Sequence, residues 1–277
     1  MTGNGSRPGT GSTPGASSVW DVNLRRHLQH AGRRFELDVR FASAARRLVL
    51  FGPSGAGKTQ TLRMIAGLGT PDAGHVRVAG RTLFDRTAGI DVPARKRGMA
   101  YLFQDYALFP HLTVAQNIAF GVQRGWLNAA REPRHEAVDR WLRTFELTAV
   151  ARQYPEQLSG GQRQRTALAR ALVAQPRALL LDEPFVALDP ALRARLRDEL
   201  ADLQAELAIP LLIITHDEAD LRRFGDEAFE LADGSIAGQR RRTDTRTDLG
   251  SEVRPVRGSE TGPACGRDRA TQTRAAA

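Results

Sequence analysis

Residues 47–59 read RLVLFGPSGAGKT, an apolar segment that runs into a turn containing three glycines. The turn fits the pattern G-x-x-x-x-G-K-[ST] at Gly52, Gly57, Lys58 and Thr59. Glycines let backbone amides converge on phosphate oxygens, and the start of a following helix adds partial positive charge. The pattern therefore predicts a phosphate-binding loop between a buried strand over 47–52 and a helix over 58–68.

The side chains of this loop predict a nucleotide together with its metal ion. We expect the Lys58 ammonium group to reach the β- and γ-phosphates, and the Thr59 hydroxyl to ligate Mg²⁺. An accidental glycine turn is the alternative, and the predicted strand and helix on either side argue against it. The predicted nucleotide-binding residues are Gly52, Pro53, Ser54, Gly55, Ala56, Gly57, Lys58 and Thr59.

Two carboxylates end a second apolar segment, LLLDEP at 179–184. In an α/β sheet, the carboxyl ends of buried parallel strands lie beside the ligand crevice. We expect Asp182 to hold the hydration shell of Mg²⁺ and Glu183 to polarise an attacking water. Taken alone, the pair could also cap a helix, and it is the phosphate loop that favours the catalytic interpretation.

Two further polar residues follow apolar segments. His216 comes after PLLIIT at 210–215, and Gln104 lies in YLFQDYALFP at 101–110. A histidine in that position can sense a γ-phosphate and orient water or base. Each also has an ordinary interpretation, as a structural histidine and as a surface glutamine. The surrounding segment alone does not decide between the functional and the ordinary interpretation.

The composition fits a globular chain that works in a reducing compartment. No apolar run approaches the roughly 20 residues that span a bilayer, and the polar N-terminus lacks the apolar core of a secretory signal. The single cysteine, Cys265, excludes an intramolecular disulfide framework. The net charge of +9 could indicate nucleic acid or an anionic membrane. The arginines are scattered rather than interleaved with aromatic residues, so we expect no nucleic-acid partner.

The order of the segments predicts one α/β domain over 19–239. Residues 1–18 and 240–277 are dominated by small and polar residues, and we expect them to be disordered. Asp189 and Pro190 predict the start of a helix that runs to about Leu207. Residues 226–236 predict an edge hairpin that turns at Asp233 and Gly234. The segment at about 105–175 is predicted to be a helical subdomain inserted into the sheet's connectivity.

A second glycine-rich stretch, LSGGQRQR at 158–165, contains no lysine and follows no strand. Ordered along the chain with the phosphate loop, Gln104, LLLDEP, ALD at 187–189 and TH at 215–216, it resembles the nucleotide-binding subunits of ABC transporters. The resemblance covers about 19–239. It implies a P-loop NTPase core of α/β class, with a mainly parallel sheet, an antiparallel β edge and an inserted helical subdomain.

The resemblance also implies a role for each matched residue. Gln104 would be a mobile glutamine that touches Mg²⁺ and water, Glu183 the general base and His216 the switch histidine. Asp189 would lie at the seam of a head-to-tail homodimer. The γ-phosphate of ATP held by the other chain would meet Ser159, Gly160, Gly161 and Gln162. The implied ligands are ATP and Mg²⁺, with Thr59, Gln104 and Asp182 at the metal.

Within the family, residues 92–121 look like the importer branch, and GRTLFDRTAGIDVP at 80–93 looks most like the molybdate group, followed by sulfate and related oxyanion importers. This implies polytopic membrane permease subunits as partners, a solute-binding protein indirectly, and a peripheral position on the cytoplasmic face of the inner membrane. Candidates for the groove that receives the permease are Tyr106, Leu108, Phe109 and His111, which could equally be packing residues. The alternatives are an importer of sulfate, iron or polyamines, and a soluble ABC ATPase that acts on nucleic acid.

Three features depart from the family pattern. Many relatives carry an aromatic residue that stacks on adenine about twenty residues before the phosphate loop, where this chain offers His30 or Phe35. Val186 stands where a serine is common. The tail after residue 239 shows no sign of the C-terminal regulatory β-barrel found in many oxyanion importers, which puts regulation through such a domain in doubt.

Overall fold

The computed structural model describes residues 18–30, 33–122, 135–186 and 188–242. The terminal segments predicted to be disordered lie outside the described residues, apart from Ser18 and residues 240–242. The last described strand runs to Arg241, two residues past the predicted domain end at 239.

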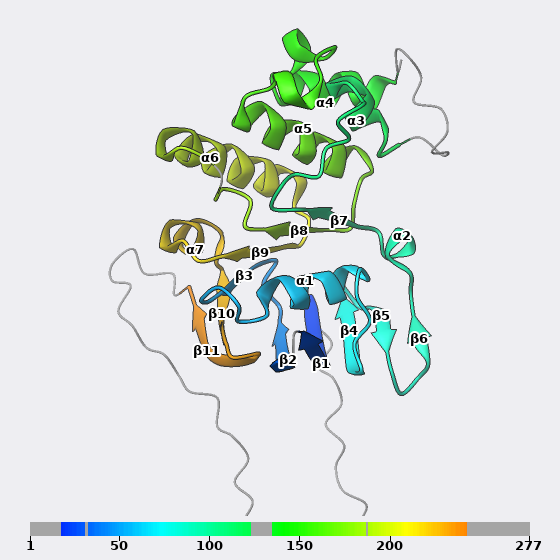
Figure 1. Ribbon diagram of the computed structural model, residues 1–277, viewed down its shortest axis with the longest axis vertical. Helices are drawn as coiled ribbons and strands as arrows, with labels where there is room; N and C mark the ends of the chain where they lie inside the picture. The colour runs from blue at the N-terminus through cyan, green and yellow to red at the C-terminus, as the bar shows by residue number, and fades with distance from the viewer. Residues whose placement is uncertain (1–17, 31–32, 123–134, 187, 243–277) are drawn as a thin grey trace, which may run out of the picture.

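One mixed sheet of eleven strands organises the described chain, in the order β6-β5-β4-β1-β2-β11-β10-β3-β9-β8-β7 (Figure 1). The pairs among β7, β8, β9, β3 and β10 are parallel, and the pairs among β2, β1, β4, β5 and β6 are antiparallel. The strands are β1 Trp20–His30, β2 Arg33–Ser43, β3 Arg47–Phe51, β4 Ala73–Val78, β5 Arg81–Asp85, β6 Ile90–Asp91, β7 Met99–Leu102, β8 Ala178–Asp182, β9 Leu211–Thr215, β10 Glu227–Ala232 and β11 Ser235–Arg241.

The α-helices of the described residues include those predicted to start at Lys58 and Pro190 and three in the segment predicted to be helical, whereas the helices over 94–97 and 218–224 were not predicted. They are α1 Lys58–Ala66, α2 Ala94–Arg97, α3 Val114–Ala119, α4 Glu136–Thr144, α5 Gly160–Val173, α6 Pro190–Leu207 and α7 Glu218–Phe224. Asp189 caps α6 through its carboxylate and Pro190 is the first helical residue, as predicted. The helix predicted over 58–68 ends at Ala66 instead, because Gly67 adopts a left-handed conformation that stops it.

Both faces of the parallel strands are covered, which explains why their sequences are continuous apolar runs. Side chains alternate between two cores along β9: Leu211 and Ile213 pack with the core around α3–α6, and Leu212 and Ile214 with the core around α1 and the β1–β2 hairpin. In Figure 1, α3, α4 and α5 lie together, beyond α6 and away from the antiparallel strands. No helix among the described residues is long and apolar enough to span a membrane.

The hairpin prediction at 226–236 was right about the turn and wrong about its place. β10 and β11 turn at Asp233 and Gly234, both of which have positive φ. The hairpin lies inside the sheet, with β10 parallel to β3 and β11 beside β2. The reason is the long β1–β2 hairpin, which extends the sheet beyond β11 and moves the edge to β6.

Candidate functional site

The phosphate loop needs its glycines for packing as well as for backbone geometry. Gly52 has φ of 150°, and a Cβ placed there would lie 2.1 Å from the carbonyl oxygen of Leu231. Gly57 has φ of 98°, which other residues rarely adopt. The Lys58 Nζ donates hydrogen bonds to the carbonyl oxygens of Gly52 and Pro53, at 2.8 and 2.9 Å. The loop is therefore wrapped around the ammonium group of Lys58.

Lys58 is buried, and that burial lowers the pKa of its ammonium group. The charges of Glu183 and Asp182 act in the opposite direction and favour the protonated form. The Lys58 Nζ lies 3.9 Å from Glu183 Oε1. A cation held in this way meets the requirement of a group that binds phosphate oxygens.

Asp182, at the end of β8, joins the phosphate loop to the neighbouring strand. Its Oδ1 accepts a hydrogen bond from the Thr59 hydroxyl at 2.9 Å, and its Oδ2 accepts one from the Tyr101 hydroxyl at 2.8 Å. Burial, followed by the negative charge of Asp182, raises the pKa of Tyr101. Tyr101 is a site residue that the sequence analysis missed, because only the pairing of β7 with β8 brings it there.

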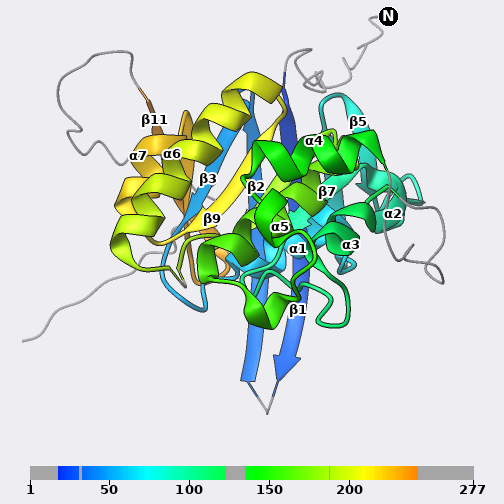
Figure 2. The same cartoon turned by 90° about the horizontal axis from the view of Figure 1, so that it is seen from above.

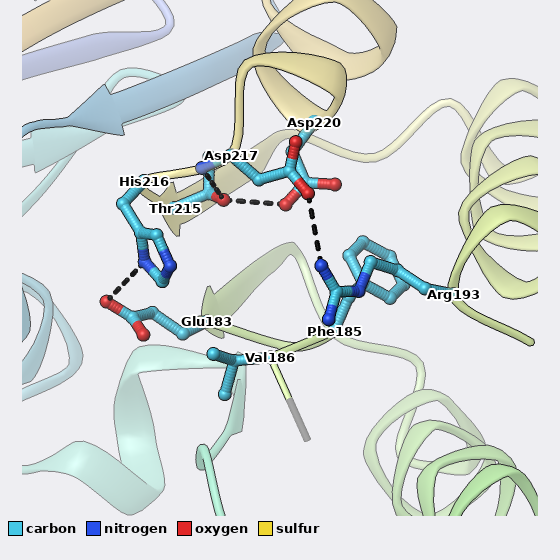
Figure 3. Close-up of a pocket in the computed structure, with 8 residues that line it drawn as sticks. All are labelled: Glu183, Phe185, Val186, Arg193, Thr215, His216, Asp217 and Asp220. Atoms are coloured by element: carbon cyan, nitrogen blue, oxygen red, sulfur yellow. Dashed lines mark hydrogen bonds and ion pairs between the residues drawn. The ribbon is translucent and has the colours of Figure 1, made fainter. Parts of the chain in front are cut away.

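Glu183 lies between the lysine and the histidine. Its Oε1 is 3.5 Å from His216 Nδ1, and its side chain is 17% exposed, against 52% for that of His216. Glu183 has φ of 46°, a left-handed conformation that costs energy for a residue with a Cβ. The two residues meet because β8 and β9 are parallel neighbours and both end at this edge. Figure 3 shows both side chains at a small pocket, with His216 turned toward Glu183.

Gln104 follows β7, which is the strand next to β8, so it belongs to the same edge of the sheet. Its side chain is exposed, and it lies two residues beyond the end of the strand. The predicted set Lys58, Thr59, Asp182, Glu183 and His216 is thus joined by contacts, and Gln104 lies nearby on a surface loop.

The stretch at 158–165 begins α5 and is built around a capping box. Ser159 Oγ accepts from the backbone amide of Gln162 at 3.3 Å, and Gln162 Oε1 accepts from the amide of Ser159 at 2.9 Å. A Cβ on Gly161 would lie 2.9 Å from Leu192 of α6, so this glycine allows close helix packing. In Figure 1, α5 lies with α3 and α4, apart from α1 and the phosphate loop.

Comparison with known proteins decides the family. The sequence profile described as ABC transporter matches residues 38–186, just over half of the chain. The chain belongs to the ABC transporter family. Two solved ATP-binding cassettes, both dimeric and one bound to ADP and phosphate, superpose with TM-scores of 0.67 and 0.66 at 28% identity. They cover 80% of this chain and 97% of their own chains, which confirms the predicted P-loop α/β fold and supports ATP hydrolysis.

Curated relatives of this ABC chain include import subunits for different solutes. The molybdenum import ATP-binding protein ModC of Paramagnetospirillum magneticum is 39% identical over 217 residues, which is 78% of this chain and 58% of the relative. ModC of Mycobacterium tuberculosis is 45% identical over 204 residues, covering 73% and 55%. The Fe(3+) ions import ATP-binding protein FbpC of Pseudomonas fluorescens is 46% identical over 191 residues, covering 69% and 53%. The chain spans a little over half the length of the curated relatives it matches.

Of the two candidates for adenine stacking in this ABC cassette, one can be located. A Cβ on Gly57 would lie 3.2 Å from the ring of Phe35, so Phe35 packs against the phosphate loop. The side chain of His30 lies outside the described residues. Val186, which replaces the common serine, is 38% exposed and lines the pocket beside Glu183 and His216 (Figure 3).

The candidates for the permease groove of the cassette divide by burial. Tyr106 is buried, and its hydroxyl has no hydrogen-bond partner in the described part of the chain. Leu108 and Phe109 are half-buried, and His111 is exposed. The Phe109 ring packs 4.4 Å from that of Phe120, which is itself exposed. Tyr106 is therefore a packing residue, and the exposed apolar surface of this segment is formed further along, at Phe120.

Proposed function

We propose that this chain is an ATPase subunit that energises an importer of molybdate or a related oxyanion. The observation that carries the proposal is the meeting of Lys58, Thr59, Asp182, Glu183 and His216 at one edge of the sheet. This set supplies a phosphate-binding cation, metal-binding oxygens and a base with its orienting partner.

The donor set fits Mg²⁺. Thr59 and Asp182 offer a hydroxyl and a carboxylate already 2.9 Å apart. No group of three or more His, Cys, Asp or Glu side chains in the described ranges could hold a metal by itself, which agrees with an ion bound by few protein groups and the nucleotide phosphates. When bound, the ion neutralises charge on the phosphates. Thr59 and Asp182 would hold it, with Gln104 joining from its loop.

The base and its partner follow from their positions. Glu183 would accept the proton of the attacking water, and His216 would orient that carboxylate and sense the γ-phosphate. Tyr101 fixes Asp182 through its hydroxyl, which leaves Asp182 Oδ1 directed at Thr59. The residues divide the work between binding, by Lys58 and Thr59, and proton transfer, by Glu183.

The remaining predicted residues belong to a head-to-tail dimer. Ser159, Gly160, Gly161 and Gln162 form the start of a helix whose cap occupies the amides of Ser159 and Gln162, and the amides of Gly160 and Gly161 would meet a phosphate brought by a second chain. Asp189 caps α6 and is exposed, as a residue at a seam would be before closure. We extend the proposal to permease subunits and a position on the cytoplasmic face of the inner membrane, as the importer relatives suggest.

The substitution Glu183→Gln tests the ATPase part. It keeps the shape of the side chain and removes the base, so purified protein should lose ATP hydrolysis by at least about 100-fold. With ATP and Mg²⁺ it should accumulate as a dimer in size-exclusion chromatography with light scattering. Hydrolysis at the wild-type rate would disprove the role of Glu183, and a monomer under these conditions would count against ATP-driven closure.

The solute is tested in cells. Deletion of the gene should lower cellular molybdenum at limiting external molybdate, and wild-type protein should restore it whereas the Glu183→Gln variant should not. FbpC is as similar as the ModC proteins, which favours iron as the second candidate. A loss of cellular iron with unchanged molybdenum, both measured by mass spectrometry, would replace molybdate by iron.

A further inference from the structure

Two arginines one turn apart on α6 hold the loops on either side of the site. Arg193 donates from Nη2 to the carbonyl oxygen of Leu188 at 3.0 Å, and its Nη1 lies 3.5 Å from Asp217 Oδ2. Leu188 is in the loop that leads to Asp189, and Asp217 directly follows His216. Figure 3 shows Arg193 reaching from its helix to Asp217 across the pocket. One guanidinium group therefore touches both loops.

Arg197 bonds to two aspartates that follow His216, Asp217 and Asp220. Its Nη2 donates to Asp217 Oδ2 at 3.1 Å and its Nε to Asp220 Oδ1 at 2.6 Å. The other oxygen of Asp220, Oδ2, accepts from the Thr215 hydroxyl at 2.6 Å. Asp220 is 3% exposed, so this part of the network is buried, and removing one partner would leave a buried charge without its counter-charge.

The residues on both sides of His216 are thus fixed. Thr215 Oγ1 also accepts from the backbone amide of Asp217 at 3.0 Å, which closes the turn around the histidine. The position of the His216 ring relative to Glu183 depends on this turn, and Arg193 ties the turn to the Leu188 carbonyl. The planar fork of arginine suits two acceptors in different loops, which a lysine ammonium group on one stem does not reach together.

We propose that Arg193 is a positioning residue that couples the loop of Asp189, at the dimer seam, to the loop of His216, at the reacting phosphate. The inference rests on the proposed ATPase function and adds a route by which closure of the dimer reaches the site. Arg193 is better suited to this than Arg197: its side chain is 31% exposed against 13%, and of these two it is the one with a hydrogen bond to the carbonyl of Leu188.

Arg193→Met and Arg195→Met form the matched pair of variants for the full-length chain. Arg195 lies on the same helix, is exposed, and pairs with Glu146 and Glu199 rather than with Leu188 or Asp217. Arg193→Met should lower kcat about tenfold with KM for ATP unchanged, because Lys58 and Thr59 still bind the phosphates. Arg195→Met should keep the wild-type values. Arg193→Lys, which keeps the charge beside Asp217, should fall between the two.

Hydrogen exchange supplies a readout that needs no hydrolysis. In Arg193→Met, backbone amides at 215–218 should exchange about fivefold faster than in the wild type and in Arg195→Met. Unchanged exchange together with unchanged kcat, in Arg193→Met or in Arg193→Lys if the former does not fold, overturns the inference. A raised KM with normal kcat also overturns it. A wild-type chain without any ATPase activity would instead count against the proposed function, and the exchange comparison would still decide the coupling.

Discussion

The backbone of Glu183 is strained at the residue that would act as the base. Its φ of 46° turns the chain directly after Asp182, while its amide still bonds to the carbonyl oxygen of Ile214 at 3.0 Å. This turn points one carboxylate back to Thr59 and the other toward Lys58 and His216. Strain kept at such a position is typical of a site where function outweighs stability.

This strain predicts that Glu183→Gly is more stable than Glu183→Gln. Glycine adopts positive φ without a Cβ clash, so the free energy of unfolding of the glycine variant should be about 1 kcal/mol higher than that of the glutamine variant. Both variants should lack ATPase activity. Urea denaturation of the two proteins measures the difference. A glycine variant that is equally or less stable would show that the left-handed backbone carries no cost here.

The carboxylate of Asp217 should contribute to the loss of folding stability at low pH. Burial is the largest single influence and raises its pKa, but the hydrogen bond from the Ala219 amide and the charges of Arg197 and Arg193 together hold the pKa below the ordinary 3.8. A lowered carboxylate pKa adds stability that is present above the unfolded-state pKa and is lost as the pH falls through the folded-state value.

Asp217→Asn should therefore be less stable than the wild type at about pH 7, and the difference should shrink as the pH falls below the ordinary carboxylate pKa of 3.8. Melting temperatures measured across this range test the prediction. The control is Asp198→Asn, because Asp198 is an exposed helix residue whose recorded ion pair is with Arg223 on the surface. A constant offset between Asp217→Asn and the wild type at every pH would contradict the ionic origin of the effect.

The helix that carries the proposed phosphate-binding residues Lys58 and Thr59 is closed by a buried arginine. Arg97 of α2 donates from Nη1 to the carbonyl oxygens of Met64 and Ile65 at 2.9 and 2.8 Å, and pairs with Asp91 at 3.1 Å. These carbonyls belong to the last turn of α1, where the Met64 oxygen also accepts from the amide of Gly67 at 3.1 Å, so Arg97 adds donors at a helix end that has few of its own. The guanidinium leaves no room for a side chain at Gly67, where a Cβ would lie 2.5 Å from its Nε.

Gly67→Ala and Gly80→Ala separate crowding from backbone strain. Both glycines have similar φ, 81° and 75°, but a Cβ on Gly80 would meet no atom within 4 Å. Gly80→Ala should cost about 1 kcal/mol of unfolding free energy and Gly67→Ala about 2–4 kcal/mol, because only the latter displaces Arg97. Chemical denaturation measures both. Equal losses would mean that Arg97 moves aside freely.

The elements that were predicted correctly are those with local signals. β3, β8 and β9 are unbroken apolar runs, and α6 has an aspartate cap with a proline behind it. The β1–β2 hairpin was missed although Trp20, Val22 and Leu24 are buried in alternation, a pattern typical of a strand. The interior place of β10 and β11 has no local signal, because it depends on pairing with strands far away in the sequence.

The same division applies to the site. Lys58, Thr59, Asp182 and Glu183 lie in motifs whose spacing carries their chemistry, so the sequence predicted them. Tyr101 reaches Asp182 through the pairing of two strands, and Arg193 reaches both of its loops through the packing of α6. Such contacts have no pattern along the chain, and a structure is needed to find them.

The fold keeps apart the two glycine-rich stretches that are proposed to bind phosphate, the loop at 52–59 and the stretch at 158–165. The phosphate loop precedes α1 against the sheet, whereas Ser159 begins α5 among the helices beyond α6 (Figure 1). Figure 2, viewed from above, shows the β1–β2 hairpin extending away from the helices. If ATP must touch both stretches, the second has to come from another chain, and the proposed head-to-tail dimer with its C2 symmetry contains two such shared sites.

A mixture of two inactive chains tests this arrangement. Lys58→Ala removes the phosphate-binding cation, and Ser159→Asp keeps a good helix cap while placing a negative charge toward the phosphate. Each protein alone should lack ATPase activity. Mixed in equal amounts, half of the dimers pair the two variants and each has one intact site of two, so about a quarter of the wild-type activity should return.

The control mixture is Lys58→Ala with Glu183→Gln. Lys58 and Glu183 lie 3.9 Å apart in the same chain, so every site of the mixed dimer lacks one of them and the mixture should stay inactive. Recovery in the first mixture and none in the second requires that one chain supplies the lysine and the other supplies Ser159. If neither mixture hydrolyses ATP although light scattering shows dimers, the two stretches do not share a nucleotide.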